Sequence, residues 1–297
     1  MTEPQSQQPP PLPPPPPPRW FGFASGVVAG ATGVLVGHAF DTMKVQAQID
    51  GGPALASSSQ GPLLQLIALY RGILPPLLTT GAIRSLYFGV FENVKLGLGA
   101  PTIGDASMGT TLCAAGFTGL SLAPVTQPFV CLKVWQQAHG GSLVAAASKL
   151  SRSRGFRGYF PGFGLHCGLE TVGSIVYLGV YYQVKRMLRA EDGTESLRMR
   201  VMAGAMAGSI AWSTIYPLDV LRSRLMAGSM AGSTSIRATA QQVYTSGGLA
   251  AFYRGIGATL MRAGPVAGVL LPVNDLIHDE LVRRAGLRCT QSGSDGG

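Results

Sequence analysis

The feature that most constrains this chain is a short motif at the end of a long uncharged run. Pro217, Asp219 and Arg222 form a proline–acid–base pattern, and residues 201–218 include no Lys, Arg, Asp or Glu. Similar stretches occur at 39–46 and 128–133. The positions equivalent to 219 are 41 and 130, so consecutive copies are 89 residues apart (130 − 41 = 219 − 130 = 89). Equal spacing of one motif three times predicts a threefold internal repeat.

Composition indicates a membrane protein. Charged residues make up 12% of the chain, about half of the ~25% of soluble domains, and glycine is abundant. Low charge with many small residues is typical of helices packed in lipid, whereas a Gly-rich soluble enzyme fits less well. The net charge of +9 is spread over helix ends and connections without a dense basic run, so no nucleic-acid partner is expected. The four cysteines show neither a CxxC pair nor metal-ligand spacing, so no metal or cofactor is expected.

Five segments are expected along the chain. Residues 1–18 are rich in Pro and Gln and predict a disordered tail, with an SH3-type ligand as the alternative reading of its proline run. Three repeats follow at 19–99, 100–191 and 192–286, and 287–297 form a flexible C-terminal tail. The start lacks the features of a secretory signal or transit peptide, so membrane targeting is expected to be internal.

Each repeat contains two long apolar segments joined by a short amphipathic piece. The apolar segments are long enough to cross a bilayer: 20–48, 73–98, 106–132, 163–189, 197–226 and 256–284. The amphipathic pieces are 63–69, 142–153 and 234–246. This order predicts an all-α membrane protein with six transmembrane helices in three pseudo-threefold repeats, short amphipathic helices and a central cavity. Because six is even, both termini are expected on one side of the membrane.

Two patterns predict how these helices pack. Gly22, Gly26 and Gly30 recur every fourth residue, as do Gly204 and Gly208, and such stripes allow close helix contact in membranes. The motif prolines should kink the odd-numbered helices toward a common axis. An acid and a base three residues apart share one helix face, so these charges should meet those of neighbouring repeats across the axis. The alternative is independent snorkelling to the membrane surface.

These residues resemble the mitochondrial carrier family over about 20–284. The family signature is Pro-x-acid-x-x-base, followed by a short helix and a Gly-rich aromatic–base–Gly turn. The stretches 37–46 and 262–265 look most like the carnitine/acylcarnitine and basic amino-acid branch. The resemblance implies a monomeric carrier of the mitochondrial inner membrane, with both termini in the intermembrane space, that exchanges a small metabolite by alternating access.

The resemblance also implies a gate at each end of the cavity. The residues that match the matrix gate are Asp41, Lys44, Gln48, Lys133, Gln137, Asp219 and Arg222. Those that match the cytoplasmic gate are Glu92, Lys95, Tyr182 in place of an acid, Lys185, Asp275, and His278 in place of a base.

Several positions depart from the family pattern. Ala39 replaces the first motif proline, so that kink is expected to come from Gly37 or to be shallower. Val130 replaces the second motif acid, which leaves three bases and two acids in the matrix gate and at most two bridges. A gate with one bridge fewer should open toward the matrix more readily.

The substrate site is expected on the even-numbered helices near mid-membrane. The matching residues are Thr79, Thr80, Arg84, Leu169, Glu170, Arg262 and Ala263. Three of them are isolated ionisable residues in apolar segments, which indicates function independently of the resemblance. Arg84 and Arg262 can bind a carboxylate and Glu170 a cationic amine, so a zwitterion of the carnitine or amino-acid type fits. The alternative is a structural ion pair of the arginines with Glu170.

The turns before the even-numbered helices are expected to bind lipid. Free N–H groups at a helix start bind phosphate well, and in the family such turns hold cardiolipin. The matching residues are Arg71, Gly72, Gly162, Arg254 and Gly255, with the turn at Gly162 weaker because it lacks the base.

Two other classes of function compete with transport. A degenerate carrier fold acting as a scaffold is suggested by Ala39 and Val130, while carriage of another carboxylate or a nucleotide-type solute keeps transport but changes its cargo. A membrane enzyme is not expected, because no metal cluster, nucleophile–base set or phosphate-binding glycine loop stands out.

Overall fold

The computed structural model describes residues 15–50, 70, 73–100, 107–139, 143–188, 196–228 and 235–285. Within these ranges, the side chains at 39–50, 75–76, 136–139, 143, 146 and 153–154 lie outside the description. The first expected amphipathic piece, 63–69, residues 1–14 of the N-terminal tail and the whole of the expected C-terminal tail, 287–297, also lie outside the described residues.

Six long helices account for most of the described chain. They are α1 (Phe21–Asp50), α3 (Leu74–Gly97), α4 (Met108–His139), α6 (Phe163–Leu188), α7 (Leu197–Gly228) and α9 (Ile256–Arg284). Short elements connect α4 to α6 and α7 to α9: α5 (Leu143–Arg154) with η1 (Gly155–Tyr159), and α8 (Ile236–Thr245) with η3 (Gly248–Tyr253). The described ranges contain no strand. The predicted all-α fold of three helix pairs is confirmed.

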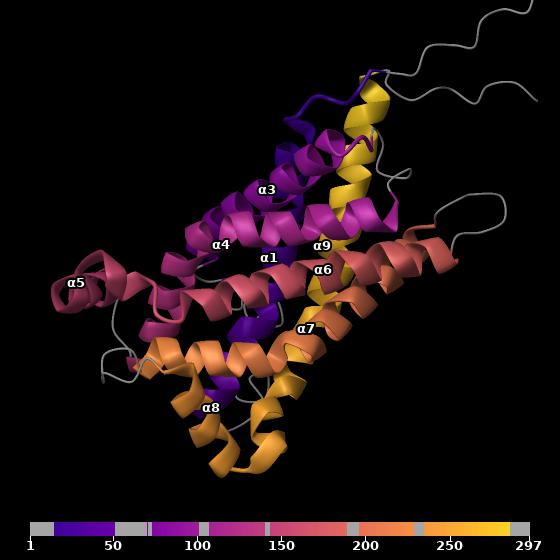
Figure 1. The fold of residues 1–297 in the computed structure, drawn as a ribbon. Coiled ribbons are helices and arrows are strands. Elements are labelled where there is room, and N and C mark those ends of the chain that lie inside the picture. Colours follow the sequence, from indigo (N-terminus) through magenta and orange to yellow (C-terminus); the bar gives the residue numbers. More distant parts are fainter. Residues whose placement is uncertain are drawn as a thin grey trace, which may run out of the picture.

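The six long helices form a closed ring in sequence order. Each helix contacts the next, and α9 returns to contact α1. Figure 1 shows them as a bundle in which α1 and α9 lie behind α4, α6 and α7, with α5 and α8 projecting at one end. The start of α1 lies beside the final part of α9, because the rings of Phe21 and His278 are 6.2 Å apart. The first and last long helices therefore begin and end at the same end of the bundle.

The predicted glycine stripes lie at helix contacts. A Cβ atom on Gly26 would stand 2.6 Å from the backbone oxygen of Arg84, and one on Gly204 would stand 2.5 Å from that of Ala267. No real Cβ atom fits there, so only glycine lets α1 approach α3, and α7 approach α9, this closely.

One helix is longer than its uncharged run suggested. The uncharged run of the second odd-numbered segment ends at Leu132, but α4 continues to His139. The added turns bring Trp135 against Leu150 of α5 and Met226 of α7 in a buried apolar cluster. Burial of this face stabilises the extension beyond the point where the apolar run ends.

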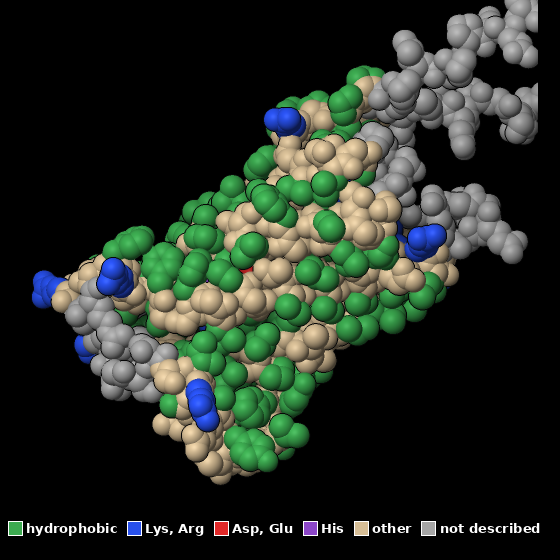
Figure 2. Space-filling model, viewed as in Figure 1, with side chains coloured by type: hydrophobic (Ala, Val, Ile, Leu, Met, Phe, Trp, Pro, Cys, Tyr) green, Lys and Arg blue, Asp and Glu red, His purple; other side chains and the backbone are tan. Residues whose placement is uncertain are grey.

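Hydrophobic side chains cover much of the outer surface. Figure 2 shows them over α4, α6 and α7, whereas the visible Lys and Arg side chains lie toward the ends of the molecule. Phe117 and Phe129 of α4 are both more than half exposed. Such extensive exposure is unfavourable in water and typical of a lipid-facing surface.

By length and composition, four described segments are apolar enough to cross a membrane. They lie in α1, α4, α6 and the stretch that ends with α9. Of the other two long helices, α3 carries Arg84, Glu92 and Lys95, and α7 begins with two arginines among its first four residues. Their place in the ring, between apolar partners, makes them part of the same bundle.

Candidate functional site

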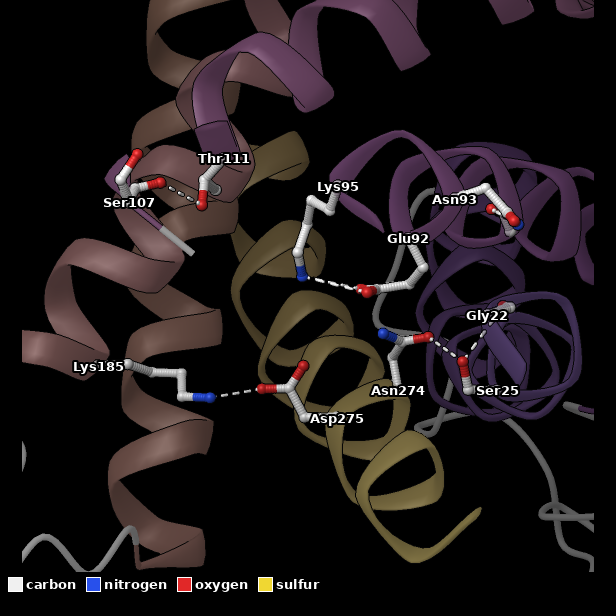
Figure 3. A network of polar contacts seen from close by, with 11 residues as sticks. Gly22, Ser25, Glu92, Asn93, Lys95, Ser107, Thr111, Lys185, Asn274 and Asp275 are labelled. Atoms are coloured by element: carbon white, nitrogen blue, oxygen red, sulfur yellow. Dashed lines mark hydrogen bonds and ion pairs between the residues drawn. The ribbon is translucent and has the colours of Figure 1, made fainter. Parts of the chain in front are cut away.

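The predicted cytoplasmic gate is assembled around Asp275 of α9, which is only 2% exposed. Lys185 of α6 places its Nζ atom 2.6 Å from Asp275 Oδ2 and donates a hydrogen bond to it. The hydroxyl of Tyr181 donates to the same oxygen at 2.8 Å. This ion pair joins α6 of the second repeat to α9 of the third, as Figure 3 shows. A buried carboxylate held by a lysine and a phenol is a strong lock between two helices.

The other acid–base pair of this gate lies within one helix. Lys95 Nζ is 3.1 Å from Glu92 Oε2, three residues earlier on α3, and both side chains are buried. Their i,i+3 spacing places Glu92 and Lys95 on one helix face, so the ion pair that they form does not itself join two repeats. The contact with the second repeat is instead aromatic, since Lys95 Nζ lies 5.5 Å from the ring centroid of Tyr182.

His278, which was expected in place of a base of this gate, lies beside α1. Its ring is buried and contacts Phe21 of α1 edge-on, and its Nδ1 atom has no hydrogen-bond partner among the described residues. Arg200 of α7 supplies further positive charge, with Nη2 3.0 Å from Asp279 and Nη1 4.0 Å from Asp275. A hydrogen bond of 2.9 Å from Ser25 to Asn274 also joins α1 to α9 at this end.

The predicted matrix gate is only partly described. The side chains of Asp41, Lys44, Gln48 and Gln137 lie outside the described residues. Lys133 is exposed, and the described side chains offer it no ion pair. Asp219 and Arg222 form an ion pair within α7. As at the other end, this pair lies within one helix and does not cross between repeats.

Arg222 also reaches toward the predicted substrate site. Its Nη1 atom is 3.6 Å from Glu170 Oε1 and 3.2 Å from His166 Nδ1, both on α6. A base assigned to the matrix gate is thus held by an acid assigned to the substrate site. Sequence reasoning missed this link because it assigned the gate residues and the substrate-site residues separately, and it did not include His166 in either set.

The substrate-site charges on α3 and α6 interact with one another. The carboxylate of Glu170 is within electrostatic range of both Arg84 and Arg222. The guanidinium of Arg84 lies 5.8 Å from the ring centroid of Tyr87 on α3, and Tyr87 in turn lies near Ser174 of α6. Tyr87 and Ser174 were not predicted as site residues, although each lies three or four residues from a predicted one on the same helix face.

The remaining predicted substrate residues differ in exposure and contacts. Thr79 is exposed and Thr80 half-buried on α3, whereas Leu169 is buried on α6. Ala263 lies at the α7–α9 crossing, where its backbone oxygen would be 2.7 Å from a Cβ on Gly208, so it serves helix packing. Arg262 extends toward α1, with its Nη1 atom 3.6 Å from the place a Cβ on Gly37 would take.

Two of the predicted lipid-binding turns are described. Gly255 has a left-handed φ of 87° and caps the start of α9, while the hydroxyl of Tyr216 donates to the Arg254 oxygen at 3.1 Å. Gly162, with φ 64°, precedes α6. Arg71 and Gly72 lie outside the described residues.

A ring of three helix pairs with isolated charges inside and an ionic lock at one end is the architecture of a membrane solute carrier. The profile of the family "Mitochondrial carrier protein" matches residues 17–101, 104–192 and 193–285. The chain therefore belongs to the mitochondrial carrier family, and the resemblance found in the sequence is confirmed at the family level.

Individual relatives match over nearly the whole chain. Mitochondrial substrate carrier family protein L of Dictyostelium discoideum is 30% identical over 83% of this chain and 90% of its own length. The mitochondrial 2-oxodicarboxylate carrier of Bos taurus is 30% identical over 86% of this chain and 93% of its own. The mitochondrial glycine transporter YMC1 of Saccharomyces cerevisiae is 28% identical, over 85% and 88%. These names do not support the expected placement in the carnitine and basic amino-acid branch.

Proposed function

We propose that this protein exchanges a small charged or zwitterionic metabolite across the mitochondrial inner membrane by alternating access. The observation that carries the proposal is the set of ionisable groups inside the helix ring, where Arg84 and Glu170 lie within electrostatic range on facing repeats. Charges within membrane helices are costly and persist where they bind a solute or one another. Membership of the mitochondrial carrier family supports the interpretation of these ionisable groups as a solute-binding site.

The contacts also support an alternating mechanism. The Lys185–Asp275 lock closes one end of the ring between repeats. Of the described matrix-gate charges, Asp219 and Arg222 pair within α7, and Arg222 also contacts Glu170 of the proposed substrate site. This asymmetry corresponds to a carrier closed on the cytoplasmic side. We place both termini in the intermembrane space, the two described glycine turns against cardiolipin, and the working unit as a monomer.

For the solute, we favour a zwitterion of the amino-acid or carnitine type. Arg84 can bind its carboxylate through two parallel hydrogen bonds, and Glu170 can bind its cationic group. A second candidate is a 2-oxodicarboxylate, because relatives carry that name and the site holds Arg262 as a second arginine. The glycine transporter among the relatives agrees with the first candidate.

Uptake into proteoliposomes tests the proposal. The purified protein would be reconstituted with internal glycine, carnitine, a basic amino acid or a 2-oxodicarboxylate, and uptake of the labelled solute would be followed. We expect exchange with at least one of them, and Glu170→Gln should abolish exchange of amine-bearing solutes while sparing that of a dicarboxylate. Absence of exchange with the whole panel and with nucleotides would favour the scaffold alternative. A thermal-shift screen against the same solutes gives an independent readout, since a ligand of the folded state stabilises it.

A further inference from the structure

A buried chain of polar side chains joins α4, α6 and α7 beside the substrate site. His166 is fully buried, with Nε2 3.0 Å from Thr126 Oγ1 and Nδ1 3.2 Å from Arg222 Nη1. A guanidinium can only donate, so His166 Nδ1 accepts from Arg222 and the ring proton is on Nε2, which donates to Thr126. The Thr126 hydroxyl in turn donates to the Leu122 oxygen at 3.1 Å. Each hydrogen bond fixes the direction of the next.

This chain determines where Arg222 lies. Glu170 is one helical turn from His166 on α6, and the two residues together receive Arg222 Nη1 from α7. The other terminal nitrogen of Arg222 binds Asp219 on its own helix. The guanidinium of Arg222 is thereby directed into the proposed substrate site. There it contacts the carboxylate of Glu170, the group that a cationic solute would need to bind.

We propose that Glu170 is shared between Arg222 and the cationic group of the solute, and that His166 is the positioning residue that holds Arg222 on Glu170 while the site is empty. A solute ammonium that binds Glu170 displaces Arg222, which then becomes available to the matrix gate. This inference rests on the proposed function and adds a requirement: a solute that drives the carrier must carry a cationic group.

The arrangement supplies the energy difference that coupling requires. A ligand shifts a conformational equilibrium only by its differential affinity for the two states. While Arg222 is held by Glu170 and His166, closing the matrix end of an empty carrier requires breaking both contacts. When a solute ammonium replaces Arg222 on Glu170, one of those contacts is already broken. Loss of the His166 contact should therefore let the empty carrier change state, which appears as efflux without exchange.

The test measures the ratio of efflux to exchange. Proteoliposomes loaded with a labelled amino acid would be diluted into buffer with or without the unlabelled amino acid. His166→Leu should raise the ratio of unidirectional efflux to exchange about tenfold, as expected for the loss of one hydrogen bond to a charged group. His166→Asn places an amide oxygen near the former Nδ1 position and should return the ratio most of the way to the wild-type value.

A matched pair of threonines provides the control. Thr126 and Thr118 are both buried on α4, and each donates to the carbonyl four residues earlier, at 3.1 Å and 2.7 Å. Of the two, Thr126 contacts His166. Thr126→Val should change the ratio in the same direction as His166→Leu, and Thr118→Val should not change it. If His166→Leu fails to fold, the efflux-to-exchange ratios of Thr126→Val and Thr118→Val test the inference in its place.

A pair of external solutes tests the cationic requirement. An amino acid should accelerate efflux from wild-type vesicles, whereas the same carboxylic acid without its amino group should not, and Glu170→Gln should remove this preference. Unchanged ratios in His166→Leu and Thr126→Val, or equal acceleration by both solutes, would overturn the inference. Exchange of 2-oxodicarboxylates without any amine-bearing solute would also overturn it, while leaving transport established. Absence of all transport would instead overturn the proposed function.

Discussion

Asp219 and Lys133 occupy equivalent motif regions but very different surroundings. Asp219 is half-buried and forms an ion pair with Arg222, whereas Lys133 is exposed on α4 beside Val130, where the motif acid is missing. The contribution of a charge depends on its partners and its desolvation, so the two should not respond alike to neutralisation.

Neutralising Asp219 should therefore impair transport more than neutralising Lys133. Asp219→Asn removes the carboxylate that holds one side of Arg222 and should lower the exchange rate roughly tenfold, the effect of about 1.4 kcal/mol from a charged hydrogen bond. Lys133→Gln should change the rate less than about twofold. Initial exchange rates in proteoliposomes measure both, and equal losses would contradict an asymmetric matrix gate.

Lys185 is the residue on which the lock at the other end depends. Lys185→Gln would leave Asp275 buried beside a neutral partner, and removal of one member of a buried pair costs about 3 kcal/mol. We expect the thermal midpoint of the purified protein to fall by roughly 5 °C or more. Arg283→Gln, which breaks an exposed pair with Glu280, is the control and should leave the midpoint unchanged. A midpoint unaltered by Lys185→Gln would show that Asp275 is not stabilised by this lysine.

At the scale of elements, the α4–α6 contact positions Glu170. A Cβ atom on Gly119 of α4 would stand 2.3 Å from the backbone oxygen of Glu170 and 2.8 Å from the hydroxyl of Ser174. The two helices can approach this closely only because position 119 has no side chain. Glu170, the acid of the proposed substrate site, is thus positioned by a glycine of the neighbouring helix, which has no side chain of its own.

Gly119→Ala should consequently disturb both stability and transport. The added methyl group must push α6 away, and overpacking of this kind typically costs about 2 kcal/mol. Gly168→Ala on α6, where a new Cβ would meet nothing within 4 Å, is the matched control and should be neutral or slightly stabilising. Thermal unfolding and exchange rates of both variants check this expectation, which fails if the two behave alike.

Helix ends show where sequence-based prediction was sufficient. The final helix was expected over 256–284 and occupies Ile256–Arg284, because a left-handed Gly255 marks its start in both sequence and structure. The end of α4 was placed too early, since the packing of Trp135 on α5 and α7 cannot be seen in the local pattern of charge. Sequence signals therefore predict a helix end well when neighbouring residues in the chain determine it, and poorly when tertiary packing determines it.

At the scale of the whole molecule, alternating access requires the lock end to open. Ser25 of α1 and Asn274 of α9 are hydrogen-bonded across the first and third repeats at 2.9 Å. Cysteines at both positions should form a cross-link under oxidation and stop exchange, and a reductant should restore it. Each single variant serves as a control for modification of one thiol. Exchange that continues in the cross-linked protein would mean that this contact stays closed during transport.

Sequence alone determined the number of repeats, the six long helices, their apolar character and the family. The repeats and helices follow from local periodicity, from the 89-residue spacing of one motif and from uncharged runs, and the family follows from the resemblance of the motif residues to the family signature. None of these depends on how distant residues meet. The sequence also indicated Arg84 and Glu170 as candidate functional residues, because an isolated charge in an apolar segment can be recognised without knowledge of the tertiary structure.

Only the tertiary structure decided which of these charges pair. The repeated motif suggested that its acids and bases meet across repeats, yet Asp219 and Arg222, the motif pair whose side chains are described, pair along their own helix. The link from Arg222 to Glu170 joins a gate to a substrate site across two repeats. Such pairing depends on the distance between neighbouring helices. Glycines such as Gly119 determine that distance, because they contact residues that are far away in the sequence. The proline–acid–base motif thus specifies where charges stand along each helix, and the packing of the ring specifies which partner each one takes.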